Sequence, residues 1–130
     1  MGAMLHHLSL AVADLDRAAA FYDAALGALG YRRAWSAADA IGYGIAEGED
    51  KLAIKRASGG LTVPGPGFHV AFAAPSREAV DRFHVAALRH GGGDNGAPGL
   101  RPHYGPHYYA AFVFDPDGHR LEAVINEAAA

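Results

Sequence analysis

The segment "HLSLAVADLDRAAAFYDAALGALG" at residues 7–30 recurs in altered form as "HVAFAAPSREAVDRFHVAALRHGG" at residues 69–92. The two segments align without a gap, so that His7 meets His69 and each strand-like run leads into a helix-like run. Agreement over a few residues arises by chance, but here it extends over a strand, a helix and the glycine that follows. We therefore interpret the chain as two copies of one structural unit.

Each copy has the pattern of a strand followed by an amphipathic helix. Alternating residues predict a strand of about seven residues, and Asp14 or Ser76 then accepts a backbone N–H as the helix cap. Gly30 and the glycines at 91–93 are typical of the turns that end helices. In the first copy the apolar helix positions recur at helical spacing and form one stripe: residues 18, 21, 22, 25, 26 and 29.

Short strands follow each helix and complete a βαβββ unit. We expect them at 31–37, 40–46 and 51–56, and then near 100–104 and at 107–115 and 119–126. The sequence "DPDG" (115–118) predicts a tight turn. If this turn pairs Asp115 with His119, Phe112 lies opposite Glu122, although a shift of one residue would reverse the faces.

The chain is predicted to be one domain spanning residues 1–130. Its first module covers about 5–57, its second about 68–126, and a Gly/Pro-rich linker joins them at 58–67. The segment 91–107 is also rich in glycine and proline and is long for a plain connection, which indicates a functional or mobile loop. Whether it acts as a lid stays open.

Composition excludes several classes of protein. The chain has 130 residues, a net charge of −3 and no cysteine, so a general nucleic-acid binder is not expected and thiolate chemistry is impossible. The apolar runs are shorter than a membrane helix requires, and the N-terminus does not resemble a signal peptide. We expect a cytoplasmic protein whose metal ligands, if any, are His, Asp or Glu.

The tandem βαβββ pattern, together with "FVFDPDGHRLEAV" (112–124), resembles the vicinal oxygen chelate superfamily. That family includes glyoxalase I, extradiol dioxygenases, fosfomycin-resistance enzymes and bleomycin-binding proteins, and this chain looks closest to its small, glyoxalase-like bacterial members. The resemblance implies an α+β fold with a cupped, mostly antiparallel sheet. It places a metal on the concave face and helices on the convex face. It also implies a homodimer.

The ligand positions of the family fall on His7, His69 and Glu122. The family's fourth position falls on Ala53, which cannot bind a metal, so the chain departs from the four-ligand glyoxalase I pattern. Strand alternation independently places the three candidates on faces that carry mostly small residues. Two imidazoles and one carboxylate leave coordination sites open and suit Fe, Mn, Zn, Ni or Co.

Polar aromatic residues surround this predicted site. Besides Glu122, the candidates for acid–base catalysis are Tyr108, His103 and His107. The candidates for substrate contact are Phe112, Tyr104, Arg101 and Trp35. The competing interpretations are that the tyrosines only pack the rim, and that Trp35 makes an ordinary core or dimer contact.

These observations favour a metal-dependent enzyme that acts on a small, oxygen-rich substrate. Its reaction would be that of a lyase or isomerase, or of a dioxygenase. The alternative is a non-catalytic homodimer that binds or sequesters a small molecule, as the bleomycin-binding relatives do. Whether His7 joins His69 of its own chain or of a partner is not decided by the sequence.

Overall fold

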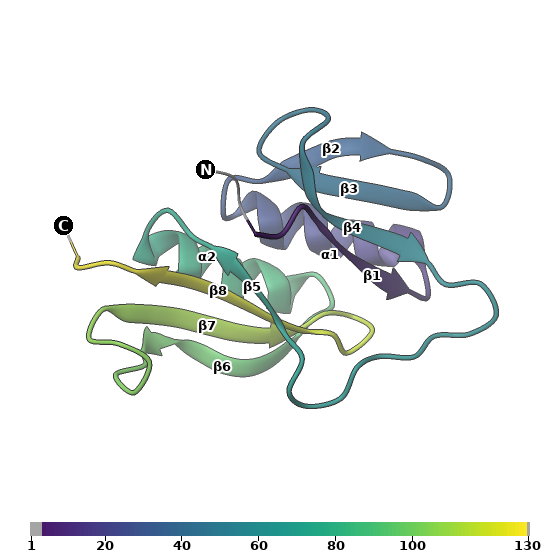
Figure 1. Cartoon of the computed structure of the whole chain (residues 1–130). Coiled ribbons are helices and arrows are strands. Elements are labelled where there is room, and N and C mark those ends of the chain that lie inside the picture. Colours follow the sequence, from purple (N-terminus) through teal and green to yellow (C-terminus); the bar gives the residue numbers. More distant parts are fainter. Residues whose placement is uncertain (1–3, 130) are drawn as a thin grey trace.

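The computed structural model describes residues 4–129, which form two βαβββ modules with two helices and eight strands in all (Figure 1). The first module contains β1 (Leu8–Val12), α1 (Leu15–Gly27), β2 (Arg32–Ser36), β3 (Ala40–Gly44) and β4 (Asp50–Arg56). The second contains β5 (Val70–Ala73), α2 (Arg77–Arg89), β6 (Gly93–Leu100), β7 (Tyr108–Phe114) and β8 (Arg120–Asn126). The tandem βαβββ prediction is confirmed.

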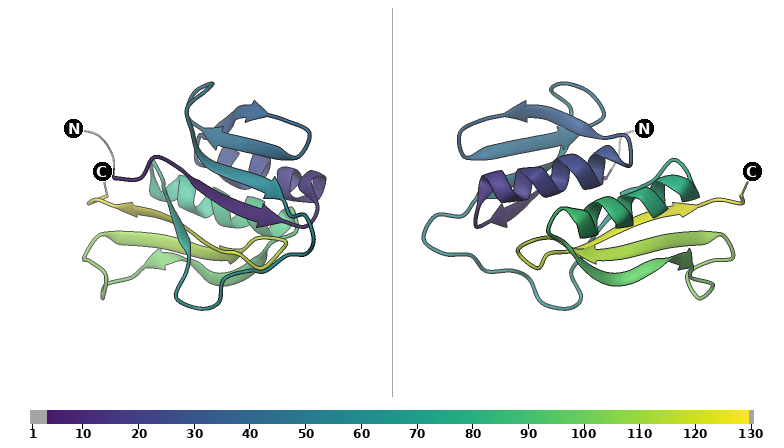
Figure 2. Two further views of the ribbon diagram at one scale, coloured as in Figure 1. Left: turned by 45° about the vertical axis from the view of Figure 1, so that its right-hand side comes forward. Right: turned by 180° about the vertical axis from the view of Figure 1, so that it is seen from behind.

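Each module forms its own four-stranded mixed sheet. The strand orders are β1-β4-β3-β2 and β5-β8-β7-β6, so β1 and β5 are equivalent edge strands, each parallel to its neighbour. The cupped sheet implied by the resemblance is therefore divided, within one chain, into two halves. Seen from behind, α1 and α2 lie side by side on the same side of the two sheets (Figure 2).

The helices begin where the sequence predicts. Asp14 Oδ1 accepts the N–H of Arg17 at 3.0 Å, and Ser76 Oγ accepts the N–H of Ala79 at 3.1 Å. Each of these bonds satisfies a backbone donor that the helix itself leaves without a partner. The equivalent caps give the two modules the same geometry between the first strand and its helix.

The core lies between the helices and the faces of the sheets that they cover. From the helices it contains Phe21, Tyr22 and Phe83, all fully buried, and the sheets contribute alternate residues. The buried strand positions are Leu10, Val12, Ile41, Tyr43, Leu52, Ile54, Val70, Ala111, Val113, Leu121 and Ala123. On the opposite, open faces, the first sheet includes the small residues Ser9, Gly42 and Ala53, whereas the second carries Glu122 with Phe112 beside it.

The structure corrects one prediction. Residues 93–100, expected to be part of a loop at 91–107, form the edge strand β6 against β7, whereas the strand expected near 100–104 is absent from the described structure. The sequence "GDNGAPGL" has neither alternation nor β-branched residues, so it carries no strand signal of its own. Pairing with β7 determines its conformation, with irregularities in register at Gly96 and Gly99.

The "DPDG" turn of the second module packs against the first module. Arg17 on α1 forms an ion pair with Asp117 at 2.8 Å, and His119 Nε2 donates to the carbonyl of Ala11 at 2.7 Å. Tyr22 donates to the buried Asp115 at 2.6 Å. Within residues 4–129, neither helix is long and apolar enough to cross a bilayer.

Candidate metal and substrate site

On the open face of the second sheet, Glu122 is at the centre of a polar cluster that also contains His69 and Tyr108, the Glu122 cluster. Its side chain is only 2% exposed, and Oε1 lies 2.8 Å from Nε2 of His69. The Tyr108 hydroxyl donates to Oε2. His69 directly precedes β5, which pairs with β8, and its side chain is 49% exposed. One side of the Glu122 carboxylate is thus shielded while the imidazole faces solvent.

Tyr108 is held as a hydrogen-bond donor. Burial first, and then the hydrogen bond and negative charge of Glu122, raises the pKa of Tyr108 to about 12. Its hydroxyl is therefore protonated at neutral pH and orients the carboxylate.

Phe112 lies opposite Glu122, as the hairpin predicted. The Phe112 ring centroid is 6.4 Å from that of the His69 ring. The guanidinium of Arg101 lies over the same Phe112 ring, 5.3 Å from its centroid. Ala71 pairs with Glu122 on the other side. A row across the sheet therefore places a small residue, a carboxylate and an aromatic ring next to one another.

The remaining candidates from the loop lie at the rim. Tyr104 packs against Tyr108 with centroids 5.2 Å apart, and His103 packs against Tyr104 at 4.1 Å. Both His103 and Tyr104 are exposed, so they extend the cluster toward solvent. His107 is exposed too, and in the described structure it does not join this aromatic row.

The predicted residues of the first module lie apart from this cluster. His7 directly precedes β1, is exposed, and places Nδ1 2.8 Å from Nδ1 of His6. Trp35 covers Gly42, where a Cβ would lie 2.2 Å from the indole nitrogen. Among residues 4–129 no three His, Asp or Glu side chains are grouped so as to hold one metal ion. One chain thus brings together His69 and Glu122 but not His7.

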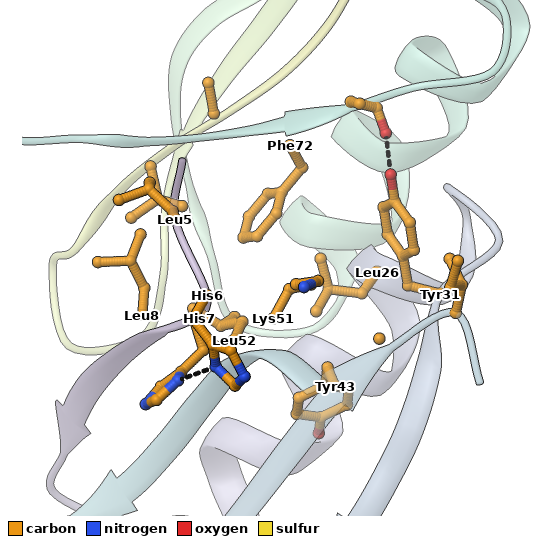
Figure 3. A pocket seen from close by; sticks show the side chains of 15 residues that line it. Leu5, His6, His7, Leu8, Leu26, Tyr31, Tyr43, Lys51, Leu52 and Phe72 are labelled. Carbon is orange, nitrogen blue, oxygen red and sulfur yellow. Dashed lines mark hydrogen bonds between the residues drawn. The ribbon is translucent and has the colours of Figure 1, made fainter. Parts of the chain in front are cut away.

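An apolar cavity of about 280 Å³ lies at the junction of the two modules (Figure 3). A hydrogen bond from the Tyr31 hydroxyl to the carbonyl of Ala73, 2.5 Å long, joins the modules beside it. The other side chains labelled in Figure 3 are Leu5, His6, His7, Leu8, Leu26, Tyr43, Lys51, Leu52 and Phe72. His69 and Glu122 do not line this cavity, but His7 does, and so does Ala71, the strand partner of Glu122.

The sequence interpretation assigned no functional role to Arg120. Its guanidinium lies over Phe114, 5.4 Å from the ring centroid, and reaches the carbonyl of Pro64 in the linker at 3.4 Å. Because side chains alternate along β8, Arg120 shares the face of Glu122. That alternation was the signal available in the sequence.

The comparisons with known proteins identify the family. The family model for the Glyoxalase/Bleomycin resistance protein/Dioxygenase superfamily matches residues 4–123. A glyoxalase/bleomycin resistance protein from Albidiferax ferrireducens is 31% identical, with 94% of this chain and 98% of that chain covered and a TM-score of 0.81. Among curated proteins, none matches the sequence closely enough to count as a relative.

More distant structures share the fold. A FosX fosfomycin-resistance protein variant from Listeria monocytogenes, solved with Mn(II) and dihydroxypropylphosphonic acid, is 19% identical over 98% of this chain and 93% of its own, with a TM-score of 0.67. A glyoxalase I variant from Zea mays is 23% identical over 92% of this chain and 46% of its own, with a TM-score of 0.65. By its sequence match and its duplicated βαβββ structure, the chain belongs to the glyoxalase/bleomycin resistance protein/dioxygenase superfamily.

Proposed function

We propose that the protein is a metal-dependent enzyme that acts on a small, oxygen-rich substrate. The observation that carries this proposal is the buried Glu122 carboxylate, which faces an imidazole at 2.8 Å and a phenol. Burying a carboxylate costs several kcal/mol unless it is paired. Nε2 of His69 and the oxygens of Glu122 are the donor types that Fe, Mn, Zn, Ni and Co accept, so these residues fit a divalent metal.

The third ligand in this proposal is His7 of a second copy in a homodimer. His7 and His69 occupy equivalent positions, each directly before an edge strand of its own sheet. An edge strand offers unpaired backbone groups to a neighbouring chain. If β1 of one copy lies beside β5 of the other, His7 reaches the face that carries His69 and Glu122.

A bound divalent metal would polarise a carbonyl or hydroxyl oxygen of the substrate. The role of Tyr108 is to hold the Glu122 carboxylate in one orientation and to offer a hydroxyl near the substrate oxygens. Phe112, with the buried Ala110 beside it along β7, provides an apolar surface that excludes water. Turnover of methylglyoxal hemithioacetal would favour lyase or isomerase chemistry, and ring cleavage of catechols would favour a dioxygenase.

Metal content of protein purified without chelator tests the site. We expect a bound divalent metal that His69→Ala or Glu122→Ala removes, while His90→Ala, at the end of α2, retains it. Unchanged metal in both site variants would contradict the proposal.

Complementation tests whether the site spans two copies. His7→Ala and His69→Ala homodimers should each lack metal. A dimer containing one chain of each has one intact intersubunit site, so a randomly reassociated equimolar mixture should recover about one quarter of the sites. If each site is built within one chain, no mixed dimer recovers metal.

The second candidate function is metal-independent binding of an apolar small molecule. The cavity at the module junction favours it, because its wall is almost entirely apolar. Saturable binding of an aromatic probe that Phe72→Ala weakens and Glu122→Ala leaves unchanged, in protein without bound metal, would support this function over the enzyme.

A further inference from the structure

Backbone carbonyls of β6 hold the guanidinium of Arg101 on the open face of the second sheet. Its two terminal nitrogens donate to the carbonyls of Gly99 at 2.9 Å and Ala97 at 2.8 Å. A Cβ at Gly96 or Gly99 would lie only 3.2 or 3.3 Å from these nitrogens. The glycines that conceal the strand signal of β6 thus leave room for a flat cation.

The position of this cation relative to Glu122 is fixed by strand pairing. Arg101 lies over Phe112, and Phe112 is the cross-strand partner of Glu122. Arg101 is therefore one aromatic ring away from the carboxylate. Arg120 makes a second guanidinium–ring stack on Phe114, two residues further along β7 on the same face.

We propose that Arg101, assisted by Arg120, binds the carboxylate group of the substrate. This inference rests on the proposed function, because it places the substrate on the face of Glu122. A guanidinium presents a planar fork of N–H donors that matches a carboxylate, and the two carbonyls occupy only part of that fork. Stacking on Phe112 fixes the plane of the fork and removes water from one side of it.

Charge on this face also favours an anion. Two guanidinium groups lie near one buried carboxylate, and a divalent metal on Glu122 would add further positive charge. The carboxylate of a small organic acid matches one guanidinium in shape and charge. The other oxygens of that substrate would then point along the row toward Glu122. The proposal thus assigns the oxygen-rich substrate to the small organic acids.

The test measures binding of para-fluorobenzoate to the full-length, chelator-treated protein by fluorine NMR. Wild-type protein should bind para-fluorobenzoate and not the neutral para-fluorobenzamide. Arg101→Gln should weaken binding by about tenfold or more, since charge-assisted hydrogen bonds are lost, and Arg120→Gln by less. Arg101→Lys should fall between, because it keeps the charge without the fork. Arg82→Gln, on the exposed side of α2, is the matched control and should bind normally.

The outcomes separate this inference from the metal site. Binding is measured without metal, so a failed metal proposal leaves the Arg101 result intact, and His69→Ala should still bind the probe. Equal binding of the amide, or unchanged binding by both Arg101→Gln and Arg120→Gln, would overturn the carboxylate subsite. Preference for para-fluorophenylphosphonate over the benzoate would overturn the assignment to carboxylates.

Discussion

The hydrogen bond between Tyr22 and Asp115 connects the two modules through the core, and Tyr22→Phe tests its contribution. The Tyr22 hydroxyl, on α1, donates to Asp115 Oδ2 at 2.6 Å, and both side chains are buried, at 0% and 3% exposure. Asp115 Oδ1 accepts the N–H groups of Asp117 and His119, each at 2.9 Å. The substitution keeps the ring but removes the partner of Oδ2, which stays buried.

A hydrogen bond to a charged group contributes about 1.5–3 kcal/mol, and an orphaned charged acceptor adds to the loss. We therefore expect Tyr22→Phe to lower the free energy of unfolding by about 2 kcal/mol, which is roughly 6 °C in Tm for a domain of this size. Urea unfolding at constant protein concentration, followed by circular dichroism, measures it. Tyr31→Phe is the control: its hydroxyl donates to a neutral carbonyl at an exposed position, so its loss should stay below about 1 kcal/mol. Equal losses in the two variants would refute the reasoning.

Three further predictions concern pH and close packing. Burial first, and then the charge of Asp115, raises the pKa of Tyr22 well above its ordinary value of 10.0. The folded state therefore favours the protonated phenol. The stabilisation that Tyr22 contributes is complete below pH 10 and declines as the pH rises further. Urea midpoints above pH 10 should fall more steeply in wild type than in Tyr22→Phe. Gly42→Ala would place a Cβ 2.2 Å from the Trp35 indole nitrogen, and the displaced indole should shift the fluorescence of this single tryptophan, at a cost of about 1–3 kcal/mol. Gly92→Ala should cost more in urea unfolding than Gly42→Ala, because its Cβ would meet the carbonyl oxygen of Phe114 at 2.7 Å, and backbone yields less readily than a side chain.

The elements that the sequence predicted are those with local signals. The helix caps at Asp14 and Ser76 and the two periodicities lie within short stretches, so both strand–helix pairs were predictable and are confirmed. The "DPDG" turn fixes the register of the hairpin because Gly118 adopts a φ of 96° that other residues rarely adopt. From that register, the pairing of Phe112 with Glu122 followed.

The strand β6 was not predictable because its stability is not local. Its residues have low strand propensity. Its conformation depends on pairing with β7 and on the hydrogen bonds that the carbonyls of Ala97 and Gly99 accept from Arg101. Composition therefore indicated a loop where tertiary pairing makes an edge strand. The same glycines that lowered its propensity are those that make room for the guanidinium.

The candidate site could be predicted within a module but not between modules. Repeat alignment and alternation place His69 beside Glu122, because β5 and β8 are neighbours in one sheet. The placement of His7 depends on how the two sheets are arranged, which is set by the packing of α1 on α2 and by the linker. Neither has a signature in the pattern of a single segment, so the sequence left the partner of His7 undecided.

Equivalent positions in the two sheets carry different kinds of side chain. Ser9 pairs with Ala53 as Ala71 pairs with Glu122, so strand register supports aligning Ala53 with Glu122. In the first module this row continues to Gly42, which Trp35 covers, and it offers no ligand. In the second module the equivalent row carries a carboxylate. His69 and Glu122 both belong to the second module, so the third ligand that we propose, His7, has to come from the first. The proposed homodimer would supply it across the edge strands β1 and β5.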